Sequence, residues 1–465
     1  MDLSHPFLEG LLSQLSAVFG FLLAAVGIAH MLRQKRSPQS ALLWFFLMLL
    51  VPYLGVPAYL LLGGRKVRTR RREKLAQQLS QGEACPIEIT GPIDRLMRTF
   101  GLPGATMGNR LHLLPSGEEA YAALLERIEA ARRSIHVLMY ILAPDAVGRE
   151  IVRRLARRAR EGVAVRLLLD DFGSWRTGAR FLAPLEEAGG RVARFMPIFA
   201  RSLRSRPNLR NHRKIVVFDG TVALSGGANI AHEYMGPTPD PRRWCDLAFL
   251  VEGPAVRHFE QVFLNDWEFA TGETLPPPEP VKPPIGATGI LQVIPSGPDV
   301  PNDPLYAGFL TAIFSAQERV WVVTPYFVPD DALEQALCLA ARRGVDVRIL
   351  VPRRSNHPIT DLARGTYLRD VQAAGGKVYL YQDGMMHAKA LLVDHDLAVI
   401  GSANMDQRSL FLDYEIGTLL YSSGEIAAVE RWMGELFRKA RRETLQAGTG
   451  RELVESLARL LAPQL

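Results

Sequence analysis

The sequence contains an internal repeat, and this repeat restricts the fold more than any other feature. The segment LHLLPSG at 111–117 returns as LQVIPSG at 291–297, and GVAVRLLLD at 162–170 returns as GVDVRILVP at 344–352. Because the matching segments occur in the same order, the chain is expected to fold as two copies of one structural unit. We therefore predict two homologous lobes.

Each lobe is predicted to alternate strands and helices. Short apolar runs without polar alternation, such as 165–170 and 347–352, are typical of strands that are covered on both faces. The run AVGREIVRRLARRAREG at 146–162 has helical spacing and ends at a glycine. This alternation predicts an α/β sandwich in each lobe.

The composition divides the chain into four parts. Residues 1–75 are apolar and then basic, whereas 108–272 and 287–465 hold the two predicted lobes. Between the lobes, residues 273–286 include the segment PPPEPVKPP, and Pro-rich segments of this kind act as semi-rigid linkers. With 465 residues, 48% of them hydrophobic, the chain is long enough to bury large cores.

The N-terminal part is predicted to be a membrane anchor. The stretch 11–32 contains no Asp, Glu, Lys or Arg, and at 1.5 Å per residue a helix of this length can cross a hydrocarbon core of roughly 30 Å. A second apolar segment at 41–64 contains Pro52 and Pro57, which kink or break helices. This second segment either spans the membrane or enters it and returns.

Positive charge is concentrated around these apolar segments. Residues 1–74 hold ten Lys or Arg and three acidic residues, which accounts for the whole formal charge of +7. The rest of the chain has no net charge, which argues against nucleic-acid binding. The run RKVRTRRREK at 65–74 favours a cytoplasmic position and contact with anionic lipid, with a solvated linker as the alternative. Two full spans would put the basic residues near position 35 outside, whereas a re-entrant second segment keeps both basic groups inside.

Both lobes end in the same polar pattern, HxKxxxxD. The pattern is formed by His212, Lys214 and Asp219 and again by His387, Lys389 and Asp394, with Asn229 and Asn404 each seventeen residues after the histidine. Residues two apart in a strand face the same side, so each His and Lys project together and the residue between them points away. Each Asp starts a turn off the reacting face and is expected to bond to the backbone or a basic neighbour. Lysine and asparagine together suit phosphate oxygens.

Two copies of this pattern with the same later asparagine resemble the phospholipase D superfamily. Its members pair two such motifs across a pseudo-two-fold axis in one active site. The apolar N-terminal segments and the sequence GSANMDQRSLFLDYEI at 401–416 are similar to those of bacterial cardiolipin synthases within the superfamily. The resemblance implies two α/β sandwich lobes related by that axis behind a membrane hairpin. It also implies a bacterial inner-membrane protein with a cytoplasmic catalytic body.

The resemblance implies a phosphatidyl transfer in which two phosphatidylglycerol molecules give cardiolipin and glycerol. In the family one motif histidine attacks phosphorus and forms a phosphohistidine, while the other protonates the leaving alcohol and then serves as base. The usual family order assigns the attack to His212 and the acid/base role to His387. The groups expected to bind the substrate phosphate are Lys214, Lys389, Asn229 and Asn404. No carboxylate cluster of metal-binding type accompanies the motifs, so we expect no catalytic metal and no cofactor, and the three scattered cysteines suggest neither a disulfide framework nor a metal knuckle.

Two acids downstream of the motifs are candidates for orienting the histidines. Asp246 and Glu415 each begin an apolar strand, where an unpaired acid would be costly, although a surface acid at a strand end is the alternative. The sequence departs from the common family pattern at Cys245, where many relatives have arginine, and at Gly227, where the second lobe has Ser402. Substrate contacts are therefore expected to differ between the lobes.

Three further residues near predicted strand ends are expected to have structural roles. Tyr140 and Tyr326 are interpreted as core residues, and His357 as a loop residue. The stretch 425–461 has amphipathic helical spacing, which predicts packing on the second lobe or contact with a membrane surface.

Several other functions are compatible with the sequence. Within enzymes these are a hydrolytic phospholipase D, a transphosphatidylase with another acceptor such as phosphatidylethanolamine, and a nuclease of the same superfamily, which the neutral body disfavours. A non-catalytic lipid-binding scaffold is disfavoured by the intact motifs in both lobes. An oligomer is possible, but the sequence specifies no oligomeric state.

Overall fold

The computed structural model describes residues 4–33, 38–63, 85–197 and 208–459. The chain divides into two compact units, one made of residues 1–67 with 198–209 and the other of 68–197 with 210–465. The predicted basic run at 65–74 lies outside the described residues.

The first unit consists of three apolar helices, α1 (Ser4–Leu32), α2 (Pro38–Leu50) and α3 (Pro52–Leu62). Within α1, residues 12–32 are long and apolar enough to cross a membrane, which agrees with the predicted stretch. The second apolar segment is broken into two helices at Val51, whose φ of −135° and ψ of 67° are not helical. Proline at the next position starts α3, since proline suits the first turn of a helix.

The helices α2 and α3 form a tight hairpin beside α1. A Cβ atom added to Gly55 of α3 would lie 2.4 Å from the carbonyl oxygen of Leu47 in α2, so the two backbones are in close contact. The Tyr53 hydroxyl lies 3.0 Å from Ser16 Oγ, and the Tyr59 hydroxyl lies 2.9 Å from His30 Nδ1. The earlier residue of α3, Tyr53, contacts the earlier residue of α1, and the later Tyr59 contacts the later one, so α3 runs parallel to α1. Helix α2, which connects them, runs antiparallel to both.

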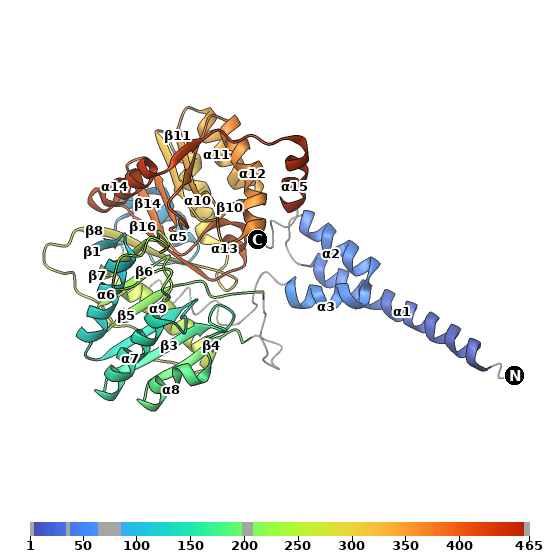
Figure 1. The fold of residues 1–465 in the computed structure, drawn as a ribbon, viewed down its shortest axis with the longest axis horizontal. Coiled ribbons are helices and arrows are strands. Elements are labelled where there is room, and N and C mark those ends of the chain that lie inside the picture. The colour runs from blue at the N-terminus through green and yellow to red at the C-terminus, as the bar shows by residue number, and fades with distance from the viewer. Residues whose placement is uncertain (1–3, 34–37, 64–84, 198–207, 460–465) are drawn as a thin grey trace. The chain divides into compact units, whose positions relative to one another are not determined.

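The second unit is built on one sheet of fifteen strands in the described residues (Figure 1). Its first half contains α5 (Ile87–Thr99), β1 (Thr106–Leu114), α6 (Gly117–Ala130), β2 (Ser134–Met139), α7 (Ala146–Arg160), β3 (Ala164–Asp170), α8 (Ala179–Glu187), β4 (Arg191–Phe195), β5 (Ile215–Phe218), β6 (Val222–Gly226), β7 (Ala248–Glu252) and α9 (Val256–Thr271). We call the half from β1 to α9 lobe 1. Helix α5 was not predicted from the sequence.

The second half, from β8 onward, is lobe 2. It contains β8 (Gly289–Ser296), α10 (Pro304–Ser315), β9 (Arg319–Val323), β10 (Phe327–Val328), α11 (Asp331–Arg342), β11 (Asp346–Pro352), α12 (Pro358–Ala373), β12 (Lys377–Tyr381), β13 (Ala390–Val393), β14 (Leu397–Gly401), β15 (Met405–Asp406), α13 (Gln407–Phe411), β16 (Glu415–Leu420), α14 (Ser423–Lys439), β17 (Arg441–Glu443) and α15 (Thr449–Arg459). The Pro-rich segment between the lobes contains neither helix nor strand.

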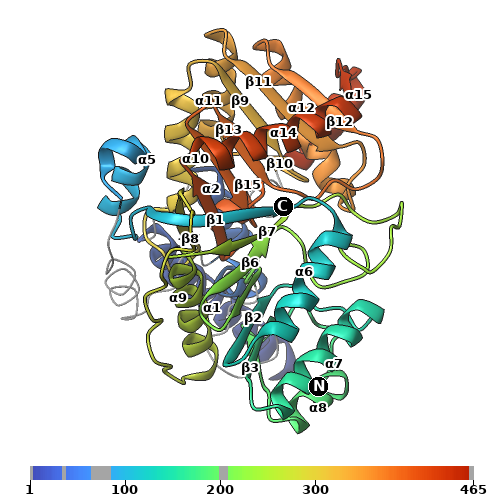
Figure 2. The same cartoon turned by 90° about the vertical axis from the view of Figure 1, so that its left-hand side faces the viewer.

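The strand order is the same in both lobes when it is read outward from the centre. Lobe 1 runs β1, β7, β6, β5, β2, β3, β4, and lobe 2 runs β8, β16, β14, β13, β9, β11, β12 with β17 added at the edge. Strands β1 and β8 pair antiparallel and join the lobes, as Figure 2 shows. The predicted repeat therefore appears as one continuous sheet with an approximate two-fold axis between β1 and β8.

Each lobe has its own apolar core, formed where helices cover the sheet. The predicted C-terminal amphipathic stretch is interrupted by β17 and forms α14 and α15. Helix α15 packs on lobe 2, since Arg459 pairs with Glu334 at 2.9 Å and Arg369 pairs with the buried Glu455 at 2.6 Å. The end of the stretch thus packs on the second lobe, as one of its two predicted roles requires.

Candidate active site

The two motifs meet because each precedes a central strand and pairs with the other lobe. His212 lies just before β5 and His387 just before β13, in extended backbone. The N–H of His212 donates to the carbonyl of Tyr414 in lobe 2 at 2.9 Å, and the N–H of His387 donates to the carbonyl of Cys245 in lobe 1 at 2.7 Å. Tyr414 directly precedes Glu415, and Cys245 directly precedes Asp246. Each bridge therefore brings an acid of one lobe to the histidine of the other.

Each histidine accordingly forms a hydrogen bond with a carboxylate from the opposite lobe. His212 Nδ1 lies 2.9 Å from Glu415 Oε1, and His387 Nδ1 lies 2.7 Å from Asp246 Oδ2. The sequence indicated each acid only as a candidate downstream of the motif in its own lobe, and the crossed pairing was not anticipated. A carboxylate at Nδ1 keeps the proton on that nitrogen and leaves the lone pair on Nε2. In the empty site Lys389 Nζ lies 3.2 Å from Nε2 of His387.

The two motif lysines are buried beside their own histidines. Lys214 Nζ donates to the carbonyl of His212 at 2.6 Å, and Lys389 Nζ donates to the carbonyl of His387. Burial lowers the pKa of Lys214 to about 7 and that of Lys389 to about 8. Burial therefore disfavours the charged form of both amines in the unliganded site, although Glu415 and Asp246 oppose this effect, and a bound anion would stabilise the charged form.

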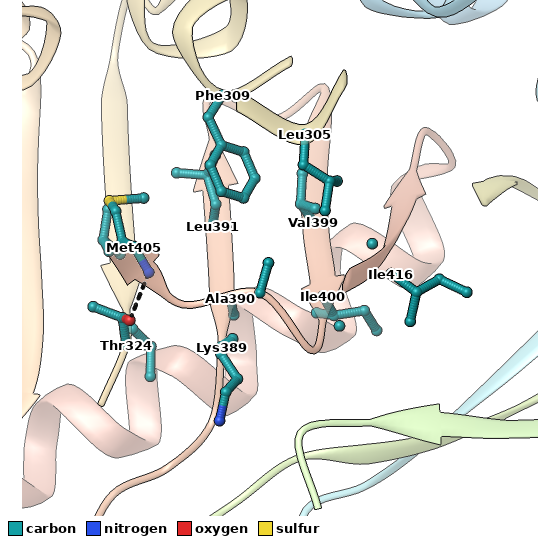
Figure 3. A pocket seen from close by; sticks show the side chains of 15 residues that line it. Leu305, Phe309, Thr324, Lys389, Ala390, Leu391, Val399, Ile400, Met405 and Ile416 are labelled. Carbon is teal, nitrogen blue, oxygen red and sulfur yellow. Dashed lines mark hydrogen bonds between the residues drawn. The ribbon is translucent and has the colours of Figure 1, made fainter. Parts of the chain in front are cut away.

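Lys389 marks the boundary between this site and the core of lobe 2. The cavity drawn in Figure 3 lies on the core side and is lined mainly by apolar side chains such as Leu305, Phe309 and Val399. The Lys389 side chain extends from the start of β13 away from Leu305 and Phe309 (Figure 3). The cavity is thus continuous with the core of lobe 2, and Lys389 lies at its polar end.

Both histidines are held in the neutral form when the site is empty. Burial, followed by the charges of Lys214 and Lys389, lowers the pKa of His212 well below its usual range. Burial and the charge of Lys389 lower the pKa of His387 to about 3, although Asp246 opposes this shift. A bound phosphate would oppose the two lysine charges and raise both histidine pKa values.

The two carboxylates differ in their readiness to ionise. Burial raises the pKa of Glu415 to about 7, although Lys214 opposes the shift. Burial also opposes ionisation of Asp246, but the charge of Lys389 and the hydrogen bond from His387 outweigh it and lower the pKa of Asp246. Asp246 is therefore a carboxylate at neutral pH, whereas Glu415 titrates in that range.

The sequence difference between Gly227 and Ser402 follows from these acids. Ser402 Oγ donates to the Glu415 carboxylate and accepts the N–H of Ile416 at 3.0 Å. In lobe 1 a Cβ atom at Gly227 would lie 2.2 Å from Asp246 Oδ1. The glycine is needed because the Asp246 carboxylate occupies the space that a serine would fill.

The motif aspartates lie at the far ends of the reactive strands. Asp219 follows β5 and accepts the backbone N–H groups of three consecutive residues, Arg132, Arg133 and Ser134, at 2.6 to 2.9 Å. Asp394 follows β13 and accepts those of Gln317, Glu318 and Arg319 at 2.8 to 2.9 Å. Both have positive φ, 53° and 47°. Each aspartate therefore fixes the start of the neighbouring strand, β2 or β9, by bonding to backbone.

The two asparagines have different partners. Asn229 Oδ1 accepts the N–H of Ile141 at 3.1 Å. Asn404 is 5% exposed, and its Oδ1 has no hydrogen-bond partner among the described residues. A buried carbonyl oxygen without a donor is costly, so Asn404 Oδ1 has capacity to accept a hydrogen bond from a ligand.

Aromatic rings enclose both histidines. Tyr140 packs edge-on against His212 with ring centroids 4.8 Å apart, and Tyr326 lies 6.3 Å from His387. Tyr234 and Trp244 lie 5.2 and 5.4 Å from His387. The interpretation of Tyr140 and Tyr326 as plain core residues was incomplete, because they line the site. Tyr140 directly follows β2 and Tyr326 lies three residues after β9, the strands that pair with β5 and β13, so nearness to the end of each strand was the available signal.

Arg213, between His212 and Lys214, points to the opposite side and joins the lobes. Its guanidinium pairs with Asp266 at 2.8 Å and donates to the carbonyl oxygens of Ser296 and Glu415, each at 3.0 Å. The equivalent residue in lobe 2 is an alanine, so this contact has no counterpart there. It holds the backbone of Glu415, and hence the acid that contacts His212, against lobe 1.

Among the described residues, one group has the geometry to hold a metal ion, and it lies outside the motif pair. The group consists of Asp145, His232 and Glu233. Asp145 caps the N-terminus of α7 by accepting from Gly148 at 2.8 Å and also accepts the N–H of His232 at 2.7 Å. Both oxygens of the Asp145 carboxylate therefore already accept hydrogen bonds from the backbone.

Comparison with known proteins identifies relatives along nearly the whole chain. The family model described as "Cardiolipin synthase, PLD-like domain" matches residues 124–267 and 309–437, and "Phospholipase_D-nuclease N-terminal" matches 22–64. Cardiolipin synthase 1 of Bacillus cereus is 34% identical, with 95% of this chain and 92% of the relative covered. Cardiolipin synthase of Geobacillus kaustophilus is 34% identical, with 100% and 97% covered. The solved structure of phosphatidylserine synthase from Haemophilus influenzae shares the fold, with a TM-score of 0.60, 16% identity, and 85% of this chain and 100% of that chain covered.

Proposed function

The chain belongs to the cardiolipin synthase family of the phospholipase D superfamily, and we propose that it transfers a phosphatidyl group between two phosphatidylglycerol molecules to give cardiolipin and glycerol. The observation that carries this proposal is the pair of histidines, each bonded to a carboxylate of the opposite lobe. Lysines from both lobes act on the same histidine, which supports a single active site.

The proposed reaction has two steps. In the first, Nε2 of His212 forms a bond to phosphorus, the bond from phosphorus to the headgroup glycerol breaks, and His387 gives its Nε2 proton to the leaving oxygen. In the second, the terminal hydroxyl of another phosphatidylglycerol gives its proton to His387, its oxygen bonds to phosphorus, and the bond to His212 breaks. The net change is two phosphatidylglycerol molecules to one cardiolipin and one glycerol.

The two carboxylates support this division of roles. The acid/base histidine must be protonated before the first step, and an ionised partner stabilises an imidazolium. Asp246, with its lowered pKa, is that kind of partner for His387. Glu415 has a pKa raised to about 7 and so provides less negative charge, which suits a neutral attacking imidazole at His212.

The buried lysines and asparagines are proposed to bind the reacting phosphate. Lys214 and Lys389 would place two positive charges on its oxygens, and the amides of Asn229 and Asn404 would donate to them. This arrangement stabilises the developing charge with fixed groups, a role that metal ions have in many other phosphoryl-transfer enzymes. We therefore expect the rate to be unchanged by a chelator.

Product analysis tests the proposal directly. Purified protein with phosphatidylglycerol vesicles is expected to release cardiolipin and glycerol in equal amounts, measured by lipid mass spectrometry and glycerol assay. A His212→Ala variant provides the background. Phosphatidic acid as the main product would instead identify a hydrolase, and a mixed product formed only when phosphatidylethanolamine is added would identify another acceptor. A rate that is lost in chelator and restored by one divalent ion would overturn the metal-free mechanism.

We also propose that α1 crosses the membrane once and that α2 and α3 enter and leave on one side. Helices α2 and α3 have 13 and 11 residues, so each is about 20 Å or less in length and too short to span the hydrocarbon core alone. Because α1 and α3 run in the same direction, Arg33 after α1 and the basic run after α3 leave at the same end of this unit. The positive-inside rule then favours the cytoplasm for both, together with the catalytic body.

Labelling of introduced cysteines tests this topology. Arg33→Cys and Arg68→Cys variants are expected to react with a membrane-impermeant maleimide only after cells are opened, with the unsubstituted protein as the control for its native cysteines. Reaction of Arg33→Cys in intact cells would show two full spans and contradict the re-entrant arrangement.

A further inference from the structure

We propose that Arg353 and Arg354 form a second anion site, which binds the phosphodiester of the acceptor lipid while its hydroxyl reacts beside His387. This inference rests on the proposed function, because it concerns the second phosphatidylglycerol. The two arginines follow β11 and line an open pocket with Gln382, Gly384 and Met385. The pocket has an empty volume of about 730 Å³, including its open mouth, which leaves room for a glycerophosphate headgroup.

The pocket shares its walls with the proposed active site. Met385 is two residues before His387, so the two are at most about 7 Å apart along the chain. The carbonyl of Met385 accepts the N–H of Cys245 at 2.8 Å, next to the Asp246 that bonds to His387. On the other wall, the Arg353 N–H donates to the carbonyl of Tyr381 at 3.0 Å. One wall of the arginine pocket therefore belongs to the segment that carries the acid/base histidine.

The loop that carries the arginines also contacts the aromatic wall of the site. Asn356, two residues after Arg354, accepts the hydroxyl of Tyr326 at 2.6 Å, and the ring of Tyr326 lies 6.3 Å from that of His387. The His357 ring lies 5.2 Å from Tyr326. A ligand in the pocket and a ligand at His387 would thus touch the same loop.

The two guanidinium groups are available for an anion. Both arginines are exposed, and neither forms an ion pair with a carboxylate among the described residues. The nearest printed partner is the neutral Gln382 side chain, 3.5 Å from Arg353. Guanidinium groups bind phosphate through two parallel hydrogen bonds, and a pair of them suits a phosphodiester.

The chemistry of the two steps explains why an anion site is needed on this side. In the first step the headgroup that leaves beside His387 is glycerol, which ends in a hydroxyl. In the second step the glycerol that occupies this place is still attached to the phosphate of the acceptor lipid. Three carbon atoms separate its reacting hydroxyl from that ester oxygen, so the acceptor phosphate must lie a few ångströms beyond His387. The arginine pocket lies on this side, since its lining residue Met385 is two residues before His387.

The matching loop of lobe 1 lacks this charge. In the repeat, Asp171 and Phe172 after β3 correspond to Arg353 and Arg354 after β11. The lobe 1 loop therefore presents an acid and an exposed aromatic ring where lobe 2 presents two cations. An anion site on one side only fits a reaction whose donor and acceptor are handled in different places.

Soluble acceptors test the inference without requiring cardiolipin formation. Phosphatidylglycerol vesicles are supplied with either isotopically labelled glycerol or labelled glycerophosphoglycerol, which is phosphatidylglycerol without its acyl chains, and entry of the label into lipid is measured as kcat/KM for each. The wild-type protein is expected to prefer glycerophosphoglycerol. The Arg353→Gln, Arg354→Gln double variant is expected to lose that preference by about tenfold or more, while transfer to glycerol changes little. Arg153→Gln, an exposed arginine on α7, is the matched control and should keep the wild-type ratio.

The outcomes separate the inference from the proposed function. An unchanged preference in the double variant, or equal losses with both acceptors, would overturn the arginine site. Absence of cardiolipin from wild-type protein would overturn the proposed function, yet the ratio of soluble acceptors would still report on the pocket. Inorganic phosphate distinguishes the ligand source. Inhibition by phosphate of transfer to glycerophosphoglycerol, but not of transfer to glycerol, supports a headgroup site. A wild-type protein that uses both acceptors equally would overturn the inference.

Discussion

In lobe 1 the acid that reaches the opposite histidine is Asp246, which stands over Gly227 and has a lowered pKa. In lobe 2 it is Glu415, which accepts a hydrogen bond from Ser402 and has a pKa raised to about 7. The histidines, lysines and backbone bridges around these acids are nearly identical in the two lobes. The histidines and lysines that occur in both lobes therefore supply the reacting groups. The residues that differ between the lobes around them give the two histidines different roles.

The same contrast extends to the loops outside the site. Arg353 and Arg354 in lobe 2 replace an acid and a phenylalanine in lobe 1, and Arg213 in lobe 1 replaces an alanine in lobe 2. Arg213 holds the lobes together from the lobe 1 side, whereas the lobe 2 arginines face an open pocket. A repeat that diverges in this way can bind two different molecules in turn at one reacting centre.

The strongest test of the comparison removes each histidine separately. With phosphatidylglycerol, His212→Ala and His387→Ala are each expected to lose about 10⁴-fold or more in kcat, because neither step proceeds without both groups. With a donor whose nitrophenol leaving group needs no proton, the variants should differ. His387→Ala is expected to form a phosphohistidine at His212 that accumulates, because the second step lacks its base.

Intact-protein mass spectrometry measures this adduct, and the initial burst of nitrophenol measures its amount. The His212→Ala variant should give neither signal with the same donor. An adduct on His387 in that variant would reverse the assignment of roles, while adducts in both variants would show that the two histidines are interchangeable.

Replacing each acid by its amide should lower kcat/KM with a different pH dependence in each lobe. Asp246 is ionised throughout pH 5.5 to 9, so Asp246→Asn is expected to lower kcat/KM by about 10³-fold at every pH. Glu415, with a pKa of about 7, is mostly protonated at pH 6 and mostly ionised at pH 8.5. Glu415→Gln should therefore cost little at pH 6 and about 10²-fold at pH 8.5.

The measurement is a pH profile of kcat/KM for wild-type protein and both variants, with circular dichroism to check folding. The wild-type profile is expected to be bell-shaped, because one imidazole must be neutral and the other protonated. Equal profiles for the two variants would contradict the different carboxylate states, and a flat wild-type rate would contradict acid/base catalysis by the pair.

Exchanging the small residues next to the acids should have an intermediate effect. Gly227→Ser adds atoms where the Cβ alone would lie 2.2 Å from Asp246, so it should displace this acid and lower activity by about 10- to 100-fold. Ser402→Gly removes one hydrogen bond to Glu415 and should cost about tenfold or less. Gly434→Ser, at an open position in α14, controls for the substitution itself. Full activity of Gly227→Ser would show that the carboxylate can move at no cost.

Local features of this molecule were readable from the sequence. The apolar runs gave the strand positions, since their spacing depends only on nearby residues. The pairing of His212 with Lys214 followed from strand geometry, and the backbone-bonding role expected for Asp219 and Asp394 rested on turn chemistry. The break in the second apolar segment at Pro52 also followed from the properties of one residue.

Features that join distant segments were not readable. The crossed pairing of His212 with Glu415 and of His387 with Asp246 depends on backbone bridges between residues 202 and 142 positions apart. The continuous sheet requires β1 and β8 to meet, which no periodicity indicates. The role of Tyr140 also depended on distance, because a tyrosine at a strand end looks the same whether it faces the core or a catalytic histidine.

The motif aspartates should show the smallest effect on catalysis and the least difference between the lobes. Asp219 and Asp394 each accept three backbone N–H groups, so Asp219→Ala and Asp394→Ala should each lower the free energy of unfolding by about 2 to 3 kcal/mol. The kcat of the folded protein should stay within about threefold, since the contacts lie at the far end of each reactive strand. Thermal unfolding in detergent, measured beside kcat, checks both statements. A loss of activity above 10³-fold with an unchanged unfolding temperature would instead make the aspartate part of the chemistry. Equal losses of stability in the two variants would show that the lobes have kept their scaffold while diverging around the histidines.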